Sequence, residues 1–215
     1  MIKLIKIDKP EVLKKNATKW TEELLSYTSK GKSPPDGIVS RYRHKDIKDS
    51  IEVECFGKCV YCGSFVSQIY WGDVEHIKPK SKYPELTYEW NNLTFVCAKC
   101  NSNKSDDFDE NLPFVNPYNE EPLDYLMPLG SMIFPRNGNK RGEITIKGIQ
   151  LNRPELIERR SERLTQLQNL VDKYKLENNT TLKKILLEEI KREIGKDKQY
   201  SMCSKAFIES YLNDK

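Results

Sequence analysis

The chain has 215 residues, of which 37% are hydrophobic and 32% are charged. This composition provides enough apolar residues for a core but not for a large one, and the length allows one or two modest domains. The formal net charge of +4 is compatible with a nucleic-acid partner without requiring one. No apolar run reaches the length of a membrane span, and lysines interrupt the first residues, which argues against a secretory signal. We therefore expect a cytoplasmic protein with reduced cysteines and no membrane partner.

The first part of the chain predicts helices. Apolar residues at helical spacing follow Pro10 and predict a helix that runs to about Tyr27. Residues 31–37 are rich in glycine, proline and serine and predict a linker. A second helix is expected over residues 44–56, ended by Gly57.

The middle of the chain predicts a hairpin followed by a helix. Residues 64–70 and 73–77 are rich in strand-forming residues, and residues 71–72 lie between them as a turn. From Asn101 onward the pattern favours about two turns of helix.

The last hundred residues have a more regular helical pattern. A hairpin is expected over residues 124–135, with its turn at 130–131, and a short helix over residues 142–149. Asn152 is expected to cap a longer helix. Two more amphipathic helices follow, and we expect all three to form a packed bundle rather than a cofactor site. Their apolar stripes include Leu182, Leu186 and Ile190 in one, and Phe207, Ile208, Tyr211 and Leu212 in the other.

Cysteine spacing gives the most specific signal. Four cysteines form two Cys-x-x-Cys pairs, which are Cys59 with Cys62 and Cys97 with Cys100. Two such turns supply the four thiolates of a tetrahedral zinc site, whereas a thiol redox centre would need only one pair. We therefore predict a structural zinc. Cys55 and Cys203 have no such partner and are expected in the core.

Between and beside these pairs lie residues suited to phosphodiester hydrolysis. His76 can take a proton from water, because a neutral imidazole is a base near neutral pH. Glu75 and Asn101 carry oxygen donors suited to Mg²⁺ or Mn²⁺. In an ideal strand Glu75 and His76 would point to opposite faces. Because both would have to act on the same phosphate, we expect the strand to end or twist here. Lys104 follows Asn101 on the same helical face and is a candidate phosphate contact.

Other polar residues have a structural as well as a functional interpretation. His44, the only other histidine, is expected to begin a helix or to pack, with contact to DNA as the alternative. Asp73 either supports the metal site from behind or hydrogen-bonds a turn at the strand edge. Basic residues elsewhere either line a path for phosphates or face solvent. They include Lys78, Lys80, Lys82 and Lys99 near His76, and Arg136, Lys140 and Arg141 in a later loop.

Residues 57–106 resemble the His-Asn-His (HNH) endonuclease family, which has the ββα-metal fold. The resemblance is carried by residues 57–63, 73–79, 90–93 and 97–104. It implies His76 as the general base and Glu75 with Asn101 as ligands of the catalytic divalent ion. It also implies that Asn92 pins the loop that carries His76. The chain departs from the pattern with asparagine at the last family position and with glutamate where aspartate is commoner.

A wider resemblance covers most of the chain. Residues 42–48, 116–118 and 148–156 look like those of PtuB-type HNH proteins, the nuclease subunits of Septu and some retron-linked anti-phage systems. Such proteins work beside an ATPase of the ABC/SMC-like class. The resemblance therefore implies DNA as substrate, a partner ATPase and a hetero-oligomer.

These patterns predict a mostly helical α+β protein in three parts. An N-terminal helical arm is expected over residues 1–37, a zinc-stapled ββα-metal HNH core over 38–115, and a partner-binding C-terminal helical region over 116–215. The predicted activity is cleavage of DNA phosphodiester bonds, with structural Zn²⁺ and catalytic Mg²⁺ or Mn²⁺. Two alternatives are a zinc-dependent module that binds nucleic acid without cutting it, and a scaffolding subunit whose C-terminal helices form the interaction surface.

Overall fold

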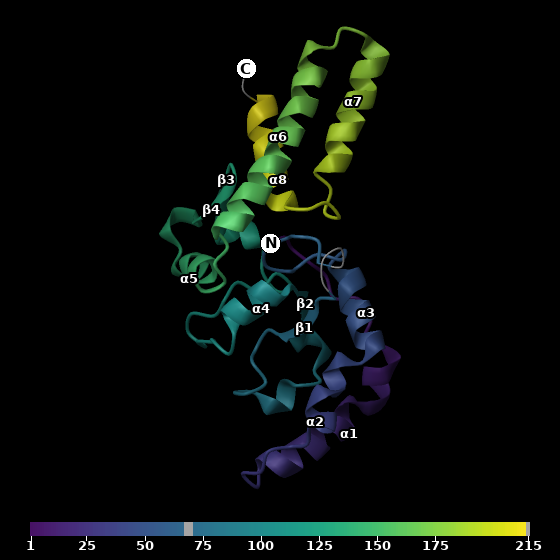
Figure 1. The fold of residues 1–215 in the computed structure, drawn as a ribbon, viewed down its shortest axis with the longest axis vertical. Helices are drawn as coiled ribbons and strands as arrows, with labels where there is room; N and C mark the ends of the chain where they lie inside the picture. Colours follow the sequence, from purple (N-terminus) through teal and green to yellow (C-terminus); the bar gives the residue numbers. More distant parts are fainter. Residues whose placement is uncertain (67–70, 214–215) are drawn as a thin grey trace.

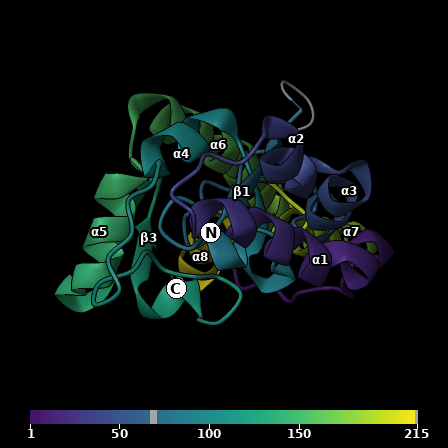
Figure 2. The same ribbon diagram turned by 90° about the horizontal axis from the view of Figure 1, so that it is seen from below.

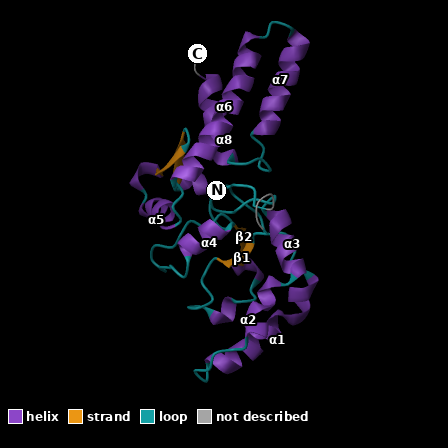
Figure 3. Ribbon diagram, viewed as in Figure 1, coloured by secondary structure: helices purple, strands orange, loops and turns teal. Residues whose placement is uncertain are grey.

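The computed structural model describes residues 1–66 and 71–213 as a mostly helical α+β protein with two small sheets (Figures 1 and 3). The molecule is elongated. The N-terminal helices lie at one end, a small sheet with its helix lies in the middle, and the last three helices form the other end (Figure 1). The predicted fold class is therefore confirmed.

Two of the N-terminal helices form as predicted, whereas a third, short helix begins inside the expected linker of residues 31–37. In chain order the three are α1 (Glu11–Thr28), α2 (Asp36–Val39) and α3 (Lys45–Glu54). His44 begins α3, because its Nδ1 accepts a hydrogen bond from the backbone N–H of Asp46 at 3.2 Å. One face of α3 is fully buried in the main core. Figure 2 shows α1, α2 and α3 gathered on one side of the central strands.

The central sheet pairs two strands that are distant in sequence. The strand β1 (Asp73–His76) pairs antiparallel with β2 (Leu93–Val96). The predicted hairpin of residues 64–70 with residues 73–77 is therefore wrong in its pairing, although a strand does form at 73–76. Residues 67–70 lie outside the described residues. The actual partner strand is buried along its whole length, and burying this apolar segment favours its pairing with β1.

The helix α4 (Ala98–Lys104) follows β2 directly and packs on β1. It begins before the predicted start at Asn101, because Cys97 caps it: the Cys97 Sγ accepts from the backbone N–H of Cys100 at 3.5 Å. Two strands and one helix thus form a compact ββα unit.

The following segments agree closely with the predicted hairpin and short helix. The strands β3 (Leu126–Leu129) and β4 (Met132–Pro135) pair antiparallel, with the turn between them at residues 130–131. The helix α5 (Lys140–Gly148) packs against β4. Short 3-10 helices in the described residues are Ser40–Arg43, Pro84–Leu86, Trp90–Asn92, Pro122–Asp124 and Arg136–Gly138.

Three long helices close the chain, as predicted. They are α6 (Pro154–Leu176), α7 (Thr180–Glu193) and α8 (Ser201–Asn213). Both α7 and α8 pack against α6. They share a small apolar core of their own, made of Leu164, Leu167, Val171, Ile190 and Ile208.

The predicted cap of α6 is wrong. Asn152 lies one residue before the cap position, which Arg153 occupies without a side-chain cap. The Asn152 side chain instead accepts from the Ile133 N–H at 2.9 Å and donates to the Ile133 carbonyl at 2.7 Å. These bonds tie β4 to the start of α6, and Pro154 supplies the helical backbone at the first turn.

One main core joins the N-terminal helices, both cysteine pairs, the two small sheets and the start of α6. Cys55 and Cys203 are buried in it at 2% and 3% exposure, which confirms them as core residues. Among residues 1–66 and 71–213, no helix is both long enough and apolar enough to cross a membrane.

Candidate metal and nuclease site

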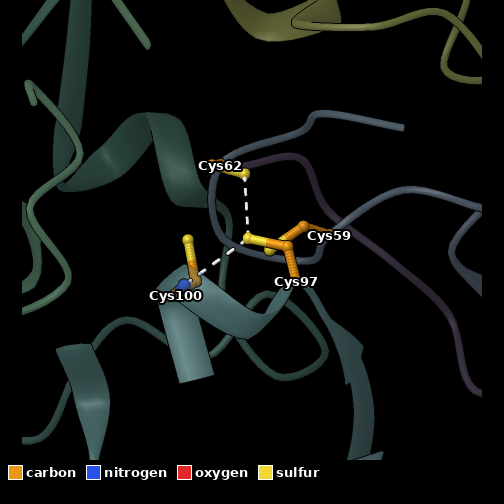
Figure 4. A group of neighbouring side chains, drawn as sticks. All are labelled: Cys59, Cys62, Cys97 and Cys100. Carbon is orange, nitrogen blue, oxygen red and sulfur yellow. Dashed lines mark hydrogen bonds between the residues drawn. The ribbon is translucent and has the colours of Figure 1, made fainter. Parts of the chain in front are cut away.

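The four paired cysteines converge at one point (Figure 4). Their Sγ atoms all lie within 4.8 Å of one another, and those of Cys62 and Cys97 are 3.9 Å apart. Sulfur atoms around a tetrahedral zinc are separated by roughly 3.8 Å, given a Zn–S bond of about 2.3 Å. Hydrogen bonding, first of all from Cys100, lowers the pKa of both Cys62 and Cys97, whereas burial raises the pKa of Cys59 and the pKa of Cys100 is also raised. The donor type and the spacing of the four sulfur atoms therefore fit a zinc ion.

His76 is held in one orientation at the end of β1. Its side chain is buried, and Nε2 lies 3.0 Å from the carbonyl oxygen of Thr87. Because a carbonyl can only accept, Nε2 carries the proton and Nδ1 keeps its lone pair. Burial lowers the pKa of His76 to about 4. The imidazole is therefore neutral at pH 7 and has the protonation state that a general base needs.

Asn92 ties together the two ends of the loop that follows His76. Its Oδ1 accepts from the backbone N–H of Lys78 at 2.8 Å. Its Nδ2 donates to the carbonyl oxygens of Lys78 and Leu86, at 3.0 and 3.2 Å. These contacts support the predicted role of Asn92, which stays a prediction.

Glu75 is buried on the face of β1 opposite His76 and is paired with Lys104. The Lys104 Nζ lies 2.6 Å from Glu75 Oε1 and also donates to the His76 carbonyl oxygen at 2.9 Å. Burial raises the pKa of Glu75, against the opposing effect of Lys104. Lys104 is fully buried, so the structure places it on Glu75 rather than on a surface open to phosphate.

Asn101 contacts a different carboxylate. Its Nδ2 donates to Asp73 Oδ2 at 3.0 Å, so β1 and α4 are joined by two side-chain contacts, Asp73 with Asn101 and Glu75 with Lys104. Neither contact uses Asn101 Oδ1 or Glu75 Oε2. An amide oxygen and a carboxylate oxygen are donors that Mg²⁺ and Mn²⁺ accept, so the residues fit such an ion in type. Metal binding by Glu75 and Asn101 stays a prediction.

Residues 59–107 match the family model described as HNH endonuclease. The chain contains an HNH-family domain. The HNH domain covers both cysteine pairs, the whole ββα unit, and His76, Asn92 and Asn101.

Two curated proteins are similar over longer stretches. The Septu protein PtuB of Bacillus mycoides (strain KBAB4) is 26% identical over 210 residues, which cover 80% of this chain and 70% of that protein. The Septu protein PtuB of Bacillus thuringiensis is 29% identical over 96 residues, which cover 44% of this chain and 37% of that protein. The chain is thus PtuB-like, and both findings support a nuclease.

Two residues outside the HNH domain contact its key side chains, and the sequence analysis did not assign either contact. The ring of Tyr42 packs edge-on against the His76 ring, with centroids 4.6 Å apart and planes at 77°. The Arg153 guanidinium lies 3.6 and 3.7 Å from the Cys100 Sγ through its two terminal nitrogens. Both residues belong to stretches that carried the wider resemblance, and that was the only signal available for them.

Proposed function

We propose that this chain is a metal-dependent endonuclease that cleaves DNA phosphodiester bonds through its HNH domain. The observation that carries the proposal is the state of His76, whose Nε2–H faces the Thr87 carbonyl and whose Nδ1 keeps a free lone pair. The same domain also holds the four-cysteine cluster and the oxygen donors of Glu75 and Asn101, which a histidine that merely filled the core would not require. A module that only binds nucleic acid would have no use for a base there.

The residues of the chain divide the work of hydrolysis. His76 Nδ1 accepts a proton from the attacking water, and the Thr87 carbonyl keeps the ring in the required tautomer. Asn92 fixes the loop behind the base. Glu75 and Asn101 would hold the catalytic Mg²⁺ or Mn²⁺, which when bound neutralises charge on the leaving oxygen. The four cysteines would hold the structural zinc, which fastens the loop before β1 to the start of α4.

The relatives favour a role in anti-phage defence. Both curated proteins are named Septu protein PtuB, so we extend the proposal to an effector subunit of a Septu-type system, regulated by an ABC/SMC-like ATPase in a hetero-oligomer. The free cysteines favour a reducing compartment such as the cytoplasm.

As the partner surface we propose the outer face of the β3–β4 hairpin. It exposes Met127, Leu129, Met132 and Phe134.

The test of the activity is nicking of supercoiled plasmid in the presence of Mg²⁺ or Mn²⁺, with and without the ATPase. Replacing His76 with alanine should lower the nicking rate by about 10²–10⁴-fold, the usual contribution of a general base. Zinc content and the melting curve of His76→Ala should be measured alongside, because the residue is buried.

The matched control is His44→Ala, which removes the only other histidine from an exposed helix start. It should nick at close to the wild-type rate. Equal nicking by a folded His76→Ala protein would remove His76 from its role. If wild type did not cut in any condition, a binding or scaffolding function would be favoured.

A further inference from the structure

Asp73 and Asn101 form a contact that the proposed reaction does not by itself require. Asp73 opens β1 and is two residues before Glu75, so both side chains lie on the face of the strand that α4 covers. On α4, Asn101 and Lys104 are three residues apart and share a helical face. Each side chain on β1 therefore meets one side chain on α4.

The direction of the Asp73–Asn101 bond decides which way the amide faces. An ionised carboxylate can only accept hydrogen bonds, so it must face the NH₂ group of Asn101 and not the oxygen. The 3.0 Å contact from Asn101 Nδ2 to Asp73 Oδ2 satisfies this requirement. A rotation of the amide by half a turn would bring two oxygens together and is disfavoured. Asn101 Oδ1, the one atom of the side chain with lone pairs for a cation, is thereby turned away from Asp73.

A similar arrangement holds Glu75. Lys104 donates to Oε1, so Oε2 is not used in that contact. In both pairs the contact between β1 and α4 engages one atom of the proposed metal ligand and leaves its other oxygen out of the contact. Side chains that orient metal ligands in this way commonly change metal affinity by about 10–100-fold when they are removed.

We propose that Asp73 is a positioning residue for the catalytic metal: it fixes the Asn101 amide so that Oδ1 faces the cation. This inference rests on the proposed function, because it assumes that Asn101 is a metal ligand. Asp73 acts through Asn101 and does not bind the cation. On this proposal, contacts within the fold orient Glu75 and Asn101 for the ion already in the protein without DNA.

The experiment measures Mn²⁺ binding directly, by titration of the zinc-loaded full chain without DNA, using calorimetry or the electron paramagnetic resonance of free Mn²⁺. Asp73→Ala should raise the Kd for Mn²⁺ by about 10–100-fold. Asp73→Asn keeps an oxygen that accepts from Asn101 Nδ2 and should stay within about threefold of wild type. In nicking assays, Asp73→Ala should need more Mn²⁺ but reach nearly the wild-type rate when Mn²⁺ saturates.

A double-mutant cycle separates positioning from a general loss of stability. In the Asn101→Ala background, adding Asp73→Ala should change the Kd no further, because the residue through which Asp73 acts is gone. Asp106→Ala, an exposed acidic residue just after α4, is the control for lost negative charge and should bind Mn²⁺ like wild type.

Three outcomes would overturn the inference. One is wild-type Mn²⁺ affinity in Asp73→Ala. Another is an equally large loss in Asp73→Asn, which would make the carboxylate a direct ligand. The third is the absence of Mn²⁺ binding in wild type, which would remove the proposed function as well. If wild type binds Mn²⁺ and His76→Ala does not nick, while Asp73→Ala is unchanged, then only the positioning role fails.

Discussion

Ser105, at the end of α4, has a backbone conformation that a residue with a side chain rarely adopts. Its φ is 48° and its ψ is −134°, and it directly follows the buried Lys104. Glycine reaches this region without steric strain, whereas other residues pay about 1–3 kcal/mol for such a conformation. The fold keeps this turn because Lys104 must end the helix facing Glu75.

Replacing Ser105 with glycine should therefore stabilise the protein. Relief of strain outweighs the added entropy of the unfolded chain, which costs about 0.4–1 kcal/mol, so we expect a net gain of about 1 kcal/mol. The measurement is the denaturant midpoint of the zinc-loaded protein. Ser102→Gly, in the regular part of the same helix, is the matched control and should lose about 0.5–1 kcal/mol. Destabilisation by both substitutions would contradict the strain argument.

Functional residues could be recognised from the sequence where they form a pattern of neighbouring residues. The cysteine pairs and the Glu75-His76 pair are short patterns, and the structure brings the four cysteines together as predicted. The contacts of Arg153 with Cys100 and of Tyr42 with His76 join residues far apart in the chain. Nothing in the neighbouring residues specifies such a contact, because it depends on how whole elements pack.

At the scale of elements, the sequence predicted the type of secondary structure better than the pairing of strands. Residues 73–76 form a strand as expected, but they pair with Leu93–Val96 across a long insertion. The pattern of a strand reports which residues are buried and how they alternate, but it does not indicate which other strand will pair with it. The hairpin β3–β4 was predicted correctly because its two strands are joined by a two-residue turn, so partner and pattern are both local.

The start of α6 shows a similar difference between local pattern and tertiary contact. Asn152 has the chemistry of a helix cap, yet it hydrogen-bonds Ile133 on β4. Arg153 then reaches the Cys100 Sγ, and Pro154 begins the helix. Three consecutive residues therefore join the hairpin, the cysteine cluster and the C-terminal bundle.

This junction predicts that Arg153 stabilises the zinc site. A zinc ion with four thiolates carries a net negative charge, and a guanidinium beside one sulfur offsets part of it. Arg153→Ala should release zinc about tenfold faster to a chromogenic chelator, and Arg153→Lys should fall between that variant and wild type. Arg159→Ala, on the exposed side of α6, is the control. Identical release rates for Arg153→Ala and wild type would show that the contact has no effect on the metal.

At the scale of the whole molecule, both ends of the chain contact the HNH domain. The N-terminal part supplies Tyr42 to His76, and the C-terminal part supplies Arg153 to Cys100. In addition, the backbone N–H of Tyr200 donates to the Gly63 carbonyl at 3.1 Å, beside the first cysteine pair. Removing either end would therefore disturb the centre, so truncation is a poor way to locate a partner surface.

Surface substitution on the β3–β4 hairpin avoids that difficulty. The strand register places Met127 opposite Phe134 and Leu129 opposite Met132, so these four side chains form one outer face, while Leu126 and Ile133 are buried beneath it. Leu129 is 67% exposed, a high value for a large apolar side chain in a sheet. Two methionines suit such a face to contact with another protein, because their flexible side chains adapt to a partner.

The double variant Leu129→Asp, Met132→Asp should therefore lose co-purification with the ATPase. Burying two carboxylates in an apolar interface without partners is strongly unfavourable, and we expect affinity to fall at least about a hundredfold. Zinc content, melting and His76-dependent nicking should remain, because neither side chain contributes to the buried core. The matched control is Leu176→Asp, Ile185→Asp, which places the same charges on exposed apolar positions of α6 and α7. Loss of binding in that control with retention in the hairpin variant would assign the partner surface to the helical bundle instead.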